Sequence, residues 1–257
     1  MILYFDDLVE AGRAVCAIRE EEVAAIEIMN RETIRIIRER SSGLDKTLAH
    51  DSHVLFVEFS GTDLSAKIDK VGRIVRTNGF RTTREAVIAT AAQEMDKLWD
   101  LRKRILPLIS NPAPGIKALA VVNDVGVAPL HLANCIMDLQ GVFKRQEIEA
   151  VIYGHAGSGN LHLRPLFDLR KPDLQGRIQR LADAVYEVIF RYGGTITAEH
   201  GMGRLRAPYL KREWGDRLYS YMQELKEIFD PQAIFNPGVM FSDKTIIDNV
   251  RPDLLHE

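Results

Sequence analysis

The chain has 257 residues, of which 46% are hydrophobic and 27% are charged, a composition typical of a folded protein with a sizeable core. Its formal net charge is −2 and its sequence pI is near 6.4, so no overall positive charge attracts nucleic acid or an anionic membrane. The composition therefore argues against a disordered chain and against a nucleic-acid-binding protein.

The cysteines and the N-terminal residues bear on the cellular setting. Cys16 and Cys135 are the only two cysteines, and both lie in apolar helical patterns, which fits buried thiols in a reducing compartment. Two thiols are too few for an iron-sulfur cluster, which four usually hold. Residues 1–7 include acidic residues where a signal peptide needs a basic region, and no apolar run approaches the ~18 residues of a membrane span. We expect a cytoplasmic protein that reaches a membrane only through a partner.

The first half of the chain alternates predicted helices and strands. Helical spacing of apolar residues predicts helices over residues 7–19, 32–40 and 64–77, and one long helix over residues 85–108. Short apolar runs at 24–29 and 54–59 predict strands, and the polar run 41–52 between them predicts a loop. Pro112, Pro114 and Gly115 end the long helix.

The second half continues this alternation. Strands are predicted over residues 117–122, 149–153, 161–166 and 193–197, and helices over residues 129–144, 173–192 and 214–229. Strands separated by helices, with a hairpin-like pair late in the chain, predict one α+β domain. We expect an antiparallel or mixed sheet covered by helices on one face.

Two histidines flank a turn in that hairpin. Residues 153–162 read Tyr-Gly-His-Ala-Gly-Ser-Gly-Asn-Leu-His, so one apolar run stops at His155 and another begins after Asn160. Small residues permit a tight turn and close backbone approach. The turn is therefore expected to bring His155 and His162 towards a common point, although they are seven positions apart.

A second glycine-rich segment carries a carboxylate and another histidine. Residues 198–203 read Ala-Glu-His-Gly-Met-Gly, which would place Glu199 and His200 on sharply turning backbone. A single histidine near a strand end is usually structural, but three of the seven histidines lie in these two segments. Two histidines and one carboxylate, His155, His162 and Glu199, are the ligand set of an open metal site. The pattern predicts a shared metal or catalytic site.

These segments resemble the signature blocks of a known family. The blocks are Gly154 to His162, Gly193 to Gly203 and Asp230 to Gly238, and their order and separation resemble the C-terminal domain of FAD-linked oxidases of the vanillyl-alcohol-oxidase type. The resemblance is to the branch that contains D-lactate dehydrogenase, glycolate oxidase and D-2-hydroxyglutarate dehydrogenase. It extends upstream to Leu98–Arg102 and Val54–Phe59, and so covers nearly the whole chain.

The resemblance implies a fold and a separate flavin domain. It implies that residues 1–257 form one domain, a ferredoxin-like cap over the isoalloxazine ring of FAD. In the family, FAD is held by an N-terminal domain with glycine-rich diphosphate-binding segments, and residues 1–52 cannot form one. We expect either a fragment of a longer protein or one subunit of a split enzyme with an FAD-binding partner, and Met1 favours the split enzyme.

The resemblance also implies roles in the oxidation of a 2-hydroxy acid. A hydride moves from the substrate to FAD while the hydroxyl group loses a proton. His155, His162 and Glu199 would hold a divalent metal, zinc or else manganese or iron, which lowers the pKa of that hydroxyl. His200 would be the base, since histidine titrates near neutral pH, and Arg102 would pair with the substrate carboxylate.

Four assignments have structural alternatives. Arg102 lies in a charged helix, where a solvated side chain is the alternative to substrate binding. Asn160 either contacts substrate or flavin, or holds the turn, and Asn236 is a flavin contact by resemblance alone, because Asn-Pro-Gly is a common turn sequence. Asp124 either orients a ligand or caps the next helix.

One position departs from the family pattern. Most relatives carry an aspartate where this chain has Ser158, so a negative charge beside the expected metal is lost. If that carboxylate orients a ligand histidine, the serine does so more weakly, and metal affinity would fall by about tenfold or more. We expect the serine to change the affinity for the metal more than the class of reaction.

Two other functions fit the same residues. The chain could be a non-catalytic interaction subunit of a flavoprotein complex, or a freestanding metal hydrolase with His200 as its base. Metal-dependent flavin reduction by a 2-hydroxy acid, seen only with an FAD-binding partner, would separate the dehydrogenase from both. Residues 204–210 resemble relatives fused or paired to iron-sulfur proteins, which implies such a protein as a further partner and electron acceptor.

Overall fold

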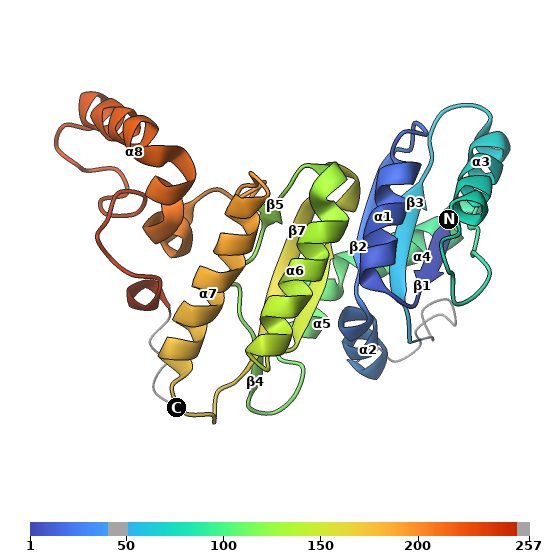
Figure 1. Cartoon of the computed structure of the whole chain (residues 1–257), viewed down its shortest axis with the longest axis horizontal. Helices are drawn as coiled ribbons and strands as arrows, with labels where there is room; N and C mark the ends of the chain where they lie inside the picture. Colours follow the sequence, from blue (N-terminus) through green and yellow to red (C-terminus); the bar gives the residue numbers. More distant parts are fainter. Residues whose placement is uncertain (41–50, 251–257) are drawn as a thin grey trace.

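The computed structural model of the chain describes residues 1–40 and 51–250, so the loop predicted over residues 41–52 lies outside the described residues except for its last two. In the described part, seven strands form one antiparallel sheet in the order β1-β3-β2-β6-β7-β4, with β5 also paired to β7 (Figure 1). Helices cover this sheet. The structure confirms the α+β class.

The strands and helices have the following bounds. The strands are β1 (Ile2–Phe5), β2 (Ala25–Met29), β3 (His53–Glu58), β4 (Ile116–Ala118), β5 (Val125–Gly126), β6 (Ala150–Gly154) and β7 (Asn160–Asp168). The α-helices are α1 (Leu8–Ile18), α2 (Arg31–Arg40), α3 (Leu64–Thr77), α4 (Ala92–Lys103), α5 (Ile105–Ile109), α6 (Leu132–Arg145), α7 (Leu174–Arg191) and α8 (Gly203–Phe229). Short 3₁₀ turns are η2 (Pro129–His131), η3 (Ala156–Ser158) and η4 (Ile247–Asn249).

The sheet has a core on each face, because successive strand residues point to opposite sides. On β2, Ile26 and Ile28 join the core beneath α1, α6 and α7, the helices in front of the sheet in Figure 1. Met29 joins a second core with residues of α2 and α5 on the other face. Helices therefore lie on both faces, whereas the sequence predicted one. Glu27 alternates with its neighbours and shares the second face with Met29.

The single helix predicted over residues 85–108 is wrong. Residues 85–91 are not helical, and the segment 82–87 runs along β1, where Ile2 and Val87 exchange backbone hydrogen bonds of 2.7 and 3.1 Å and cover the edge of the sheet. The helix begins at Ala92 and is interrupted at Arg104 between α4 and α5. Pro107 explains the interruption. In a helix, the proline ring clashes with the carbonyl group four residues earlier, here that of Lys103, and proline has no N–H to donate to it.

The strand predicted over residues 193–197 is also wrong. Only Thr195 forms a β-bridge, with Gly126, in that segment. The Glu213 carboxylate accepts hydrogen bonds from the Thr195 hydroxyl, at 2.8 Å, and from the Ile196 amide, at 2.9 Å. Beyond the bridge at Thr195, a side chain thus accepts the Ile196 amide hydrogen bond that a partner strand would accept.

Two predicted boundaries shift. The strand expected over residues 117–122 ends at Ala118, and the Val121 carbonyl is satisfied by the buried Tyr186 hydroxyl at 3.1 Å instead of by a strand. The last helix begins at Gly203 rather than Trp214, and Gly215, with φ 74° and ψ 164°, breaks it into two segments. The second segment and the turn after it project from the body as an arm, and the chain then returns to pack against α7 at η4 (Figure 1). None of the described helices is long and apolar enough to cross a membrane.

Candidate metal and substrate site

The hairpin of β6 and β7 carries His155 and His162 to one place. The turn between the strands is η3, and the two imidazole rings lie 5.5 Å apart in an edge-to-face arrangement. The turn depends on Gly159, which has φ 77° and passes so close to Val127 that a Cβ would lie 1.9 Å from the Val127 carbonyl oxygen. The local sequence of small residues thus sets the position of both histidines.

A buried carboxylate, Asp124, holds the segment that carries Glu199 and His200. It accepts hydrogen bonds from the backbone amides of Glu199 and His200, at 3.2 and 2.7 Å, and from the Thr197 hydroxyl at 3.0 Å. Burial alone would raise the pKa of Asp124, but these hydrogen bonds outweigh burial and lower it. Asp124 is therefore a charged anchor for this segment, rather than a helix cap.

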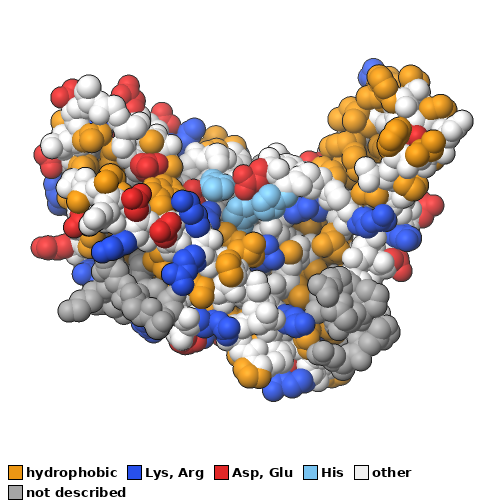
Figure 2. All heavy atoms as spheres, turned by 180° about the vertical axis from the view of Figure 1, so that it is seen from behind, with side chains coloured by type: hydrophobic (Ala, Val, Ile, Leu, Met, Phe, Trp, Pro, Cys, Tyr) orange, Lys and Arg blue, Asp and Glu red, His pale blue; other side chains and the backbone are white. Residues whose placement is uncertain are grey.

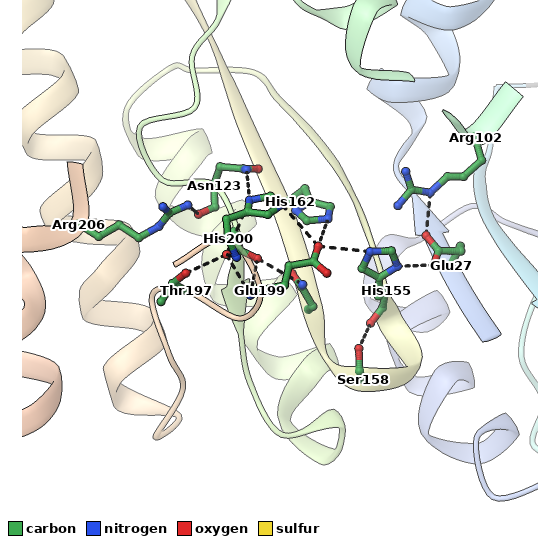
Figure 3. Close-up of polar contacts among 12 residues, drawn as sticks. Glu27, Arg102, Asn123, His155, Ser158, His162, Thr197, Glu199, His200 and Arg206 are labelled. Carbon is green, nitrogen blue, oxygen red and sulfur yellow. Dashed lines mark hydrogen bonds and ion pairs between the residues drawn. The ribbon is translucent and has the colours of Figure 1, made fainter. Parts of the chain in front are cut away.

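Three histidines converge on one oxygen of Glu199. Its Oε1 lies 3.2 Å from His162 Nε2, 3.4 Å from His155 Nε2 and 3.5 Å from His200 Nε2 (Figure 3). The rings of His162 and His200 are stacked, with centroids 5.1 Å apart. Figure 2 shows the histidines on the floor of the hollow between two raised ends of the molecule. The cluster is therefore open to solvent on one side.

The chemistry of these donors fits a divalent metal. Asp124, His162, Glu199 and His200 offer ligand atoms that all lie within 4.8 Å of one another, and His155 faces Glu199 Oε1 from the side of β2. Both oxygens of Asp124 already accept hydrogen bonds. The three histidines and Glu199 are therefore more available as metal ligands. Burial lowers the pKa of His162 to about 4, which keeps this imidazole neutral and able to donate a lone pair.

Glu27 is a member of the site that the sequence did not predict. This carboxylate is 4% exposed on β2, and its Oε1 lies 2.5 Å from His155 Nδ1 while its Oε2 lies 2.7 Å from Arg102 Nε (Figure 3). The hydrogen bond to Glu27 raises the pKa of His155 despite partial burial. Glu27 is the one charged residue in the apolar run of β2, and a charge that is buried in a strand needs a partner. This feature of the sequence could have identified Glu27 as a site residue.

Arg102 reaches the site from α4. Its side chain is only 13% exposed, and its guanidinium carbon lies 5.1 Å from the centre of the Tyr153 ring. The alternative of a solvated side chain therefore does not hold for Arg102. Although none of the residues of α4 is fully buried, this helix places a cation beside the histidine hairpin.

The other predicted residues differ in their placement. Asn160 is buried at the start of β7, where its amide donates to Asp124 at 3.3 Å, and its Oδ1 has no hydrogen-bond partner among the described residues. The Ser158 hydroxyl donates to the His155 carbonyl at 2.9 Å and so binds the turn backbone, not an imidazole ring. Asn236 lies outside the cluster, in an exposed turn after α8 with φ 47°.

The comparisons with known proteins agree with these features. Residues 1–240 match the family described as FAD linked oxidases, C-terminal domain. The chain belongs to this family. Among curated relatives, this FAD-linked oxidase C-terminal domain is 27% identical over 247 residues to glycolate oxidase subunit GlcD of Bacillus subtilis, covering 94% of the chain and 50% of the relative. It is 31% identical over 185 residues to D-2-hydroxyglutarate dehydrogenase of Pseudomonas putida, covering 71% of the chain and 18% of the relative.

Solved structures share the fold of this domain. The chain matches p-cresol methylhydroxylase with bound substrate at a TM-score of 0.59 and 11% identity, covering 94% of the chain and 52% of that protein. It matches 4-ethylphenol oxidase from Gulosibacter chungangensis at a TM-score of 0.57 and 14% identity, covering 94% and 53%. The chain thus spans about half the length of GlcD and of these two proteins.

Proposed function

We propose that this domain is the substrate-binding and catalytic cap of a flavin-dependent 2-hydroxy acid dehydrogenase, with FAD held by a separate domain or subunit. The observation that carries the proposal is the convergence of His155, His162 and His200 on Glu199, with Arg102 beside them. Membership in a family of FAD-linked oxidases, and relatives named glycolate oxidase and D-2-hydroxyglutarate dehydrogenase, support the choice of reaction.

Arg102 and a metal held by three side chains would bind the substrate. The guanidinium of Arg102 would form a charge-assisted pair with the substrate carboxylate. His155, His162 and Glu199 would hold a divalent metal, zinc or alternatively manganese or iron, which makes the substrate hydroxyl more acidic when bound. The free Oδ1 of Asn160 would accept a hydrogen bond from substrate or flavin, and Asn236 would contact the flavin.

His200 would accept the proton that the substrate hydroxyl loses. Its Nε2 faces the cluster, and its Nδ1 lies 3.3 Å from the Asn123 amide and 3.7 Å from the Asp124 carboxylate (Figure 3). The buried negative charge of Asp124 would stabilise the imidazolium that forms. With FAD bound, the carbinol carbon would give its hydrogen with two electrons to the flavin, the hydroxy acid would become an oxo acid, and His200 would hold the hydroxyl proton.

An FAD-binding partner completes the proposed enzyme. The chain spans about half the length of its relative GlcD, and its α8 arm carries exposed apolar side chains that such a partner would cover. For the electron acceptor, the proposal retains the iron-sulfur protein that the resemblance of residues 204–210 implies.

A pull-down and a flavin assay test the proposal. The tagged chain is purified gently from its native cell, its visible spectrum is recorded and the accompanying polypeptides are identified by mass. A yellow complex that D-lactate or glycolate bleaches only when divalent metal is present is the expected result. A colourless chain that hydrolyses esters by itself would overturn the proposal.

Variants of that complex test the separate roles. Because a general base contributes about 10²- to 10⁴-fold, His200→Ala should slow flavin reduction by that factor while metal content is retained. His155→Ala should lose both metal and flavin reduction. His131→Ala, which changes a histidine of η2 outside the cluster, is the control and should keep both. Wild-type reduction rates in His200→Ala would contradict the role of His200 as base.

A further inference from the structure

We infer that Glu27 is a positioning residue that orients His155 and Arg102 together, and so couples metal affinity to substrate affinity. The inference rests on the proposed function, since it assigns His155 to the metal and Arg102 to the substrate carboxylate. It concerns one buried carboxylate on β2 that joins two side chains from different elements, the histidine hairpin and α4.

The environment of Glu27 requires both contacts. Its side chain is 5% exposed, and each of its oxygens has a different partner, Nδ1 of His155 and Nε of Arg102. A carboxylate removed from water is stable only when its charge is compensated and its lone pairs accept hydrogen bonds. Arg102 supplies the opposite charge, and His155 supplies the second hydrogen bond.

The contact with His155 sets which nitrogen faces the site. With Nδ1–H donated to Glu27, Nε2 is the nitrogen that faces Glu199, at 3.4 Å. A carboxylate that holds the far nitrogen of a ligand histidine fixes its tautomer and ring orientation. The family pattern suggested residue 158 for this role, but the Ser158 hydroxyl donates its hydrogen bond to the backbone carbonyl of His155. In this chain the orienting carboxylate comes from β2.

The contact with Arg102 leaves its outer edge available. Within residues 1–40 and 51–250, Glu27 is the only carboxylate paired with Arg102, and it takes the Nε–H. The two Nη nitrogens of a guanidinium form the edge that pairs with a carboxylate in a bidentate manner. Figure 3 shows Arg102 held beside His155 through Glu27, so one residue fixes both the cation and the imidazole.

The test compares Glu27→Gln with the wild-type chain. The amide keeps the size of the side chain but removes its charge, and it cannot accept hydrogen bonds from both His155 and Arg102 through two oxygens. Zn²⁺ affinity of the isolated chain, measured by competition with a coloured chelator, should fall about 10- to 100-fold, as expected for loss of an orienting partner. In the complex with its FAD-binding partner, KM for D-lactate or glycolate should rise at least tenfold.

Matched variants make the result decisive. Glu149→Gln changes an exposed carboxylate that pairs with Arg35, and should keep wild-type Zn²⁺ affinity and KM. If Glu27→Gln does not fold, Glu27→Asp retains the charge but is too short to contact both partners, so at least one of the two quantities should still change severalfold. A lower melting temperature with unchanged Zn²⁺ affinity and KM would make Glu27 purely structural and overturn the inference.

The wild-type chain separates this inference from the proposed function. If the wild-type chain neither binds Zn²⁺ nor supports flavin reduction with its partner, the proposed function fails. If it does both, and the Glu27 variants match it in Zn²⁺ affinity and KM, the function stands and only the positioning role of Glu27 is refuted.

Discussion

Gly159 is the residue on which the geometry of the histidine hairpin depends most directly. It combines a left-handed backbone, φ 77°, with a contact so close that any side chain would meet the Val127 carbonyl. The same two residues are joined by a hydrogen bond from the Val127 amide to the Gly159 carbonyl, 3.1 Å long. A side chain here would therefore separate the hairpin from β5 and displace His155 and His162.

We predict that Gly159→Ala lowers the free energy of unfolding by about 2 to 5 kcal/mol, from the left-handed backbone and the steric overlap together. Urea unfolding of the isolated chain measures the loss. Gly79→Ala is the control, because Gly79 has φ 70° but no atom within 4 Å of an added Cβ, and it should cost about 1 to 2 kcal/mol. Equal losses in the two variants would refute the close approach to Val127.

The sequence predicted part of the site, for reasons that particular residues show. His155, His162, Glu199 and His200 lie in two glycine-rich segments, and their side chains meet at Glu199 Oε1. Glu27 lies more than 120 positions from the hairpin, and only the pairing of β2 with β6 brings it to His155. Contacts that depend on strand order cannot be derived from local patterns, so this member was missed.

At the scale of elements, the start of α2 depends on a neutral histidine from β3. The amide of Arg31, the first residue of α2, donates to His53 Nδ1 at 3.0 Å. This contact satisfies one of the amide groups that the start of a helix leaves without a partner. Burial, with a smaller contribution from the charge of Arg31, lowers the pKa of His53 to about 4. Protonation would remove the acceptor and place a charge in a buried position.

The stability of the chain should therefore fall in mild acid. The pKa of His53 is about 4 in the folded chain and about 6.5 when unfolded, so between these values the unfolded chain binds more protons. The contribution of His53 is complete above pH 6.5 and is lost as the pH falls to about 4, a loss of about 3 kcal/mol. Chemical unfolding across pH 4 to 7 should show a smaller acid loss in His53→Asn, whose amide oxygen can accept the same hydrogen bond.

A second histidine variant controls for general acid effects. His131→Asn alters a histidine of η2 and should follow the wild-type curve of stability against pH. If His53→Asn also follows that curve, the buried imidazole does not govern acid stability.

Element boundaries show what local patterns can and cannot predict. α3 was predicted residue for residue, because Val71 and Val75 form an apolar face at helical spacing. β1 was not predicted, since four apolar residues at the chain start become a strand only by pairing with β3. The strand predicted over residues 193–197 is reduced to one bridge between Thr195 and Gly126, because the next amide, that of Ile196, donates to the Glu213 side chain. The local pattern was sufficient for α3, whereas tertiary partners decided the two outcomes that the sequence did not predict.

At the scale of the whole molecule, the histidine cluster lies between two raised ends, one of which is the α8 arm (Figures 1 and 2). After Gly215, large apolar residues recur at intervals of three and four along the arm, as on one face of an amphipathic helix. The exposed ones are Leu218, Tyr221, Leu225, Ile228 and Phe229, followed by Ile234 and Phe235 in the next turn. An apolar surface of this kind is typical of a binding interface. We propose that the FAD-binding partner covers it.

We predict that replacing Ile228 and Phe229 with serine weakens binding of the FAD-binding polypeptide recovered in the pull-down by at least tenfold. These side chains are 74% and 78% exposed, so the stability of the isolated chain should change by less than about 1 kcal/mol, whereas buried interface anchors contribute about 2 kcal/mol or more each. Zn²⁺ affinity should stay unchanged, because Ile228 and Phe229 are exposed on the arm and are not among the residues that form the histidine cluster. Titration calorimetry measures both affinities. Met137→Ser, on α6 and 50% exposed, is the control. Unchanged partner affinity in the arm variant, or an equal loss in Met137→Ser, would show that the partner binds elsewhere.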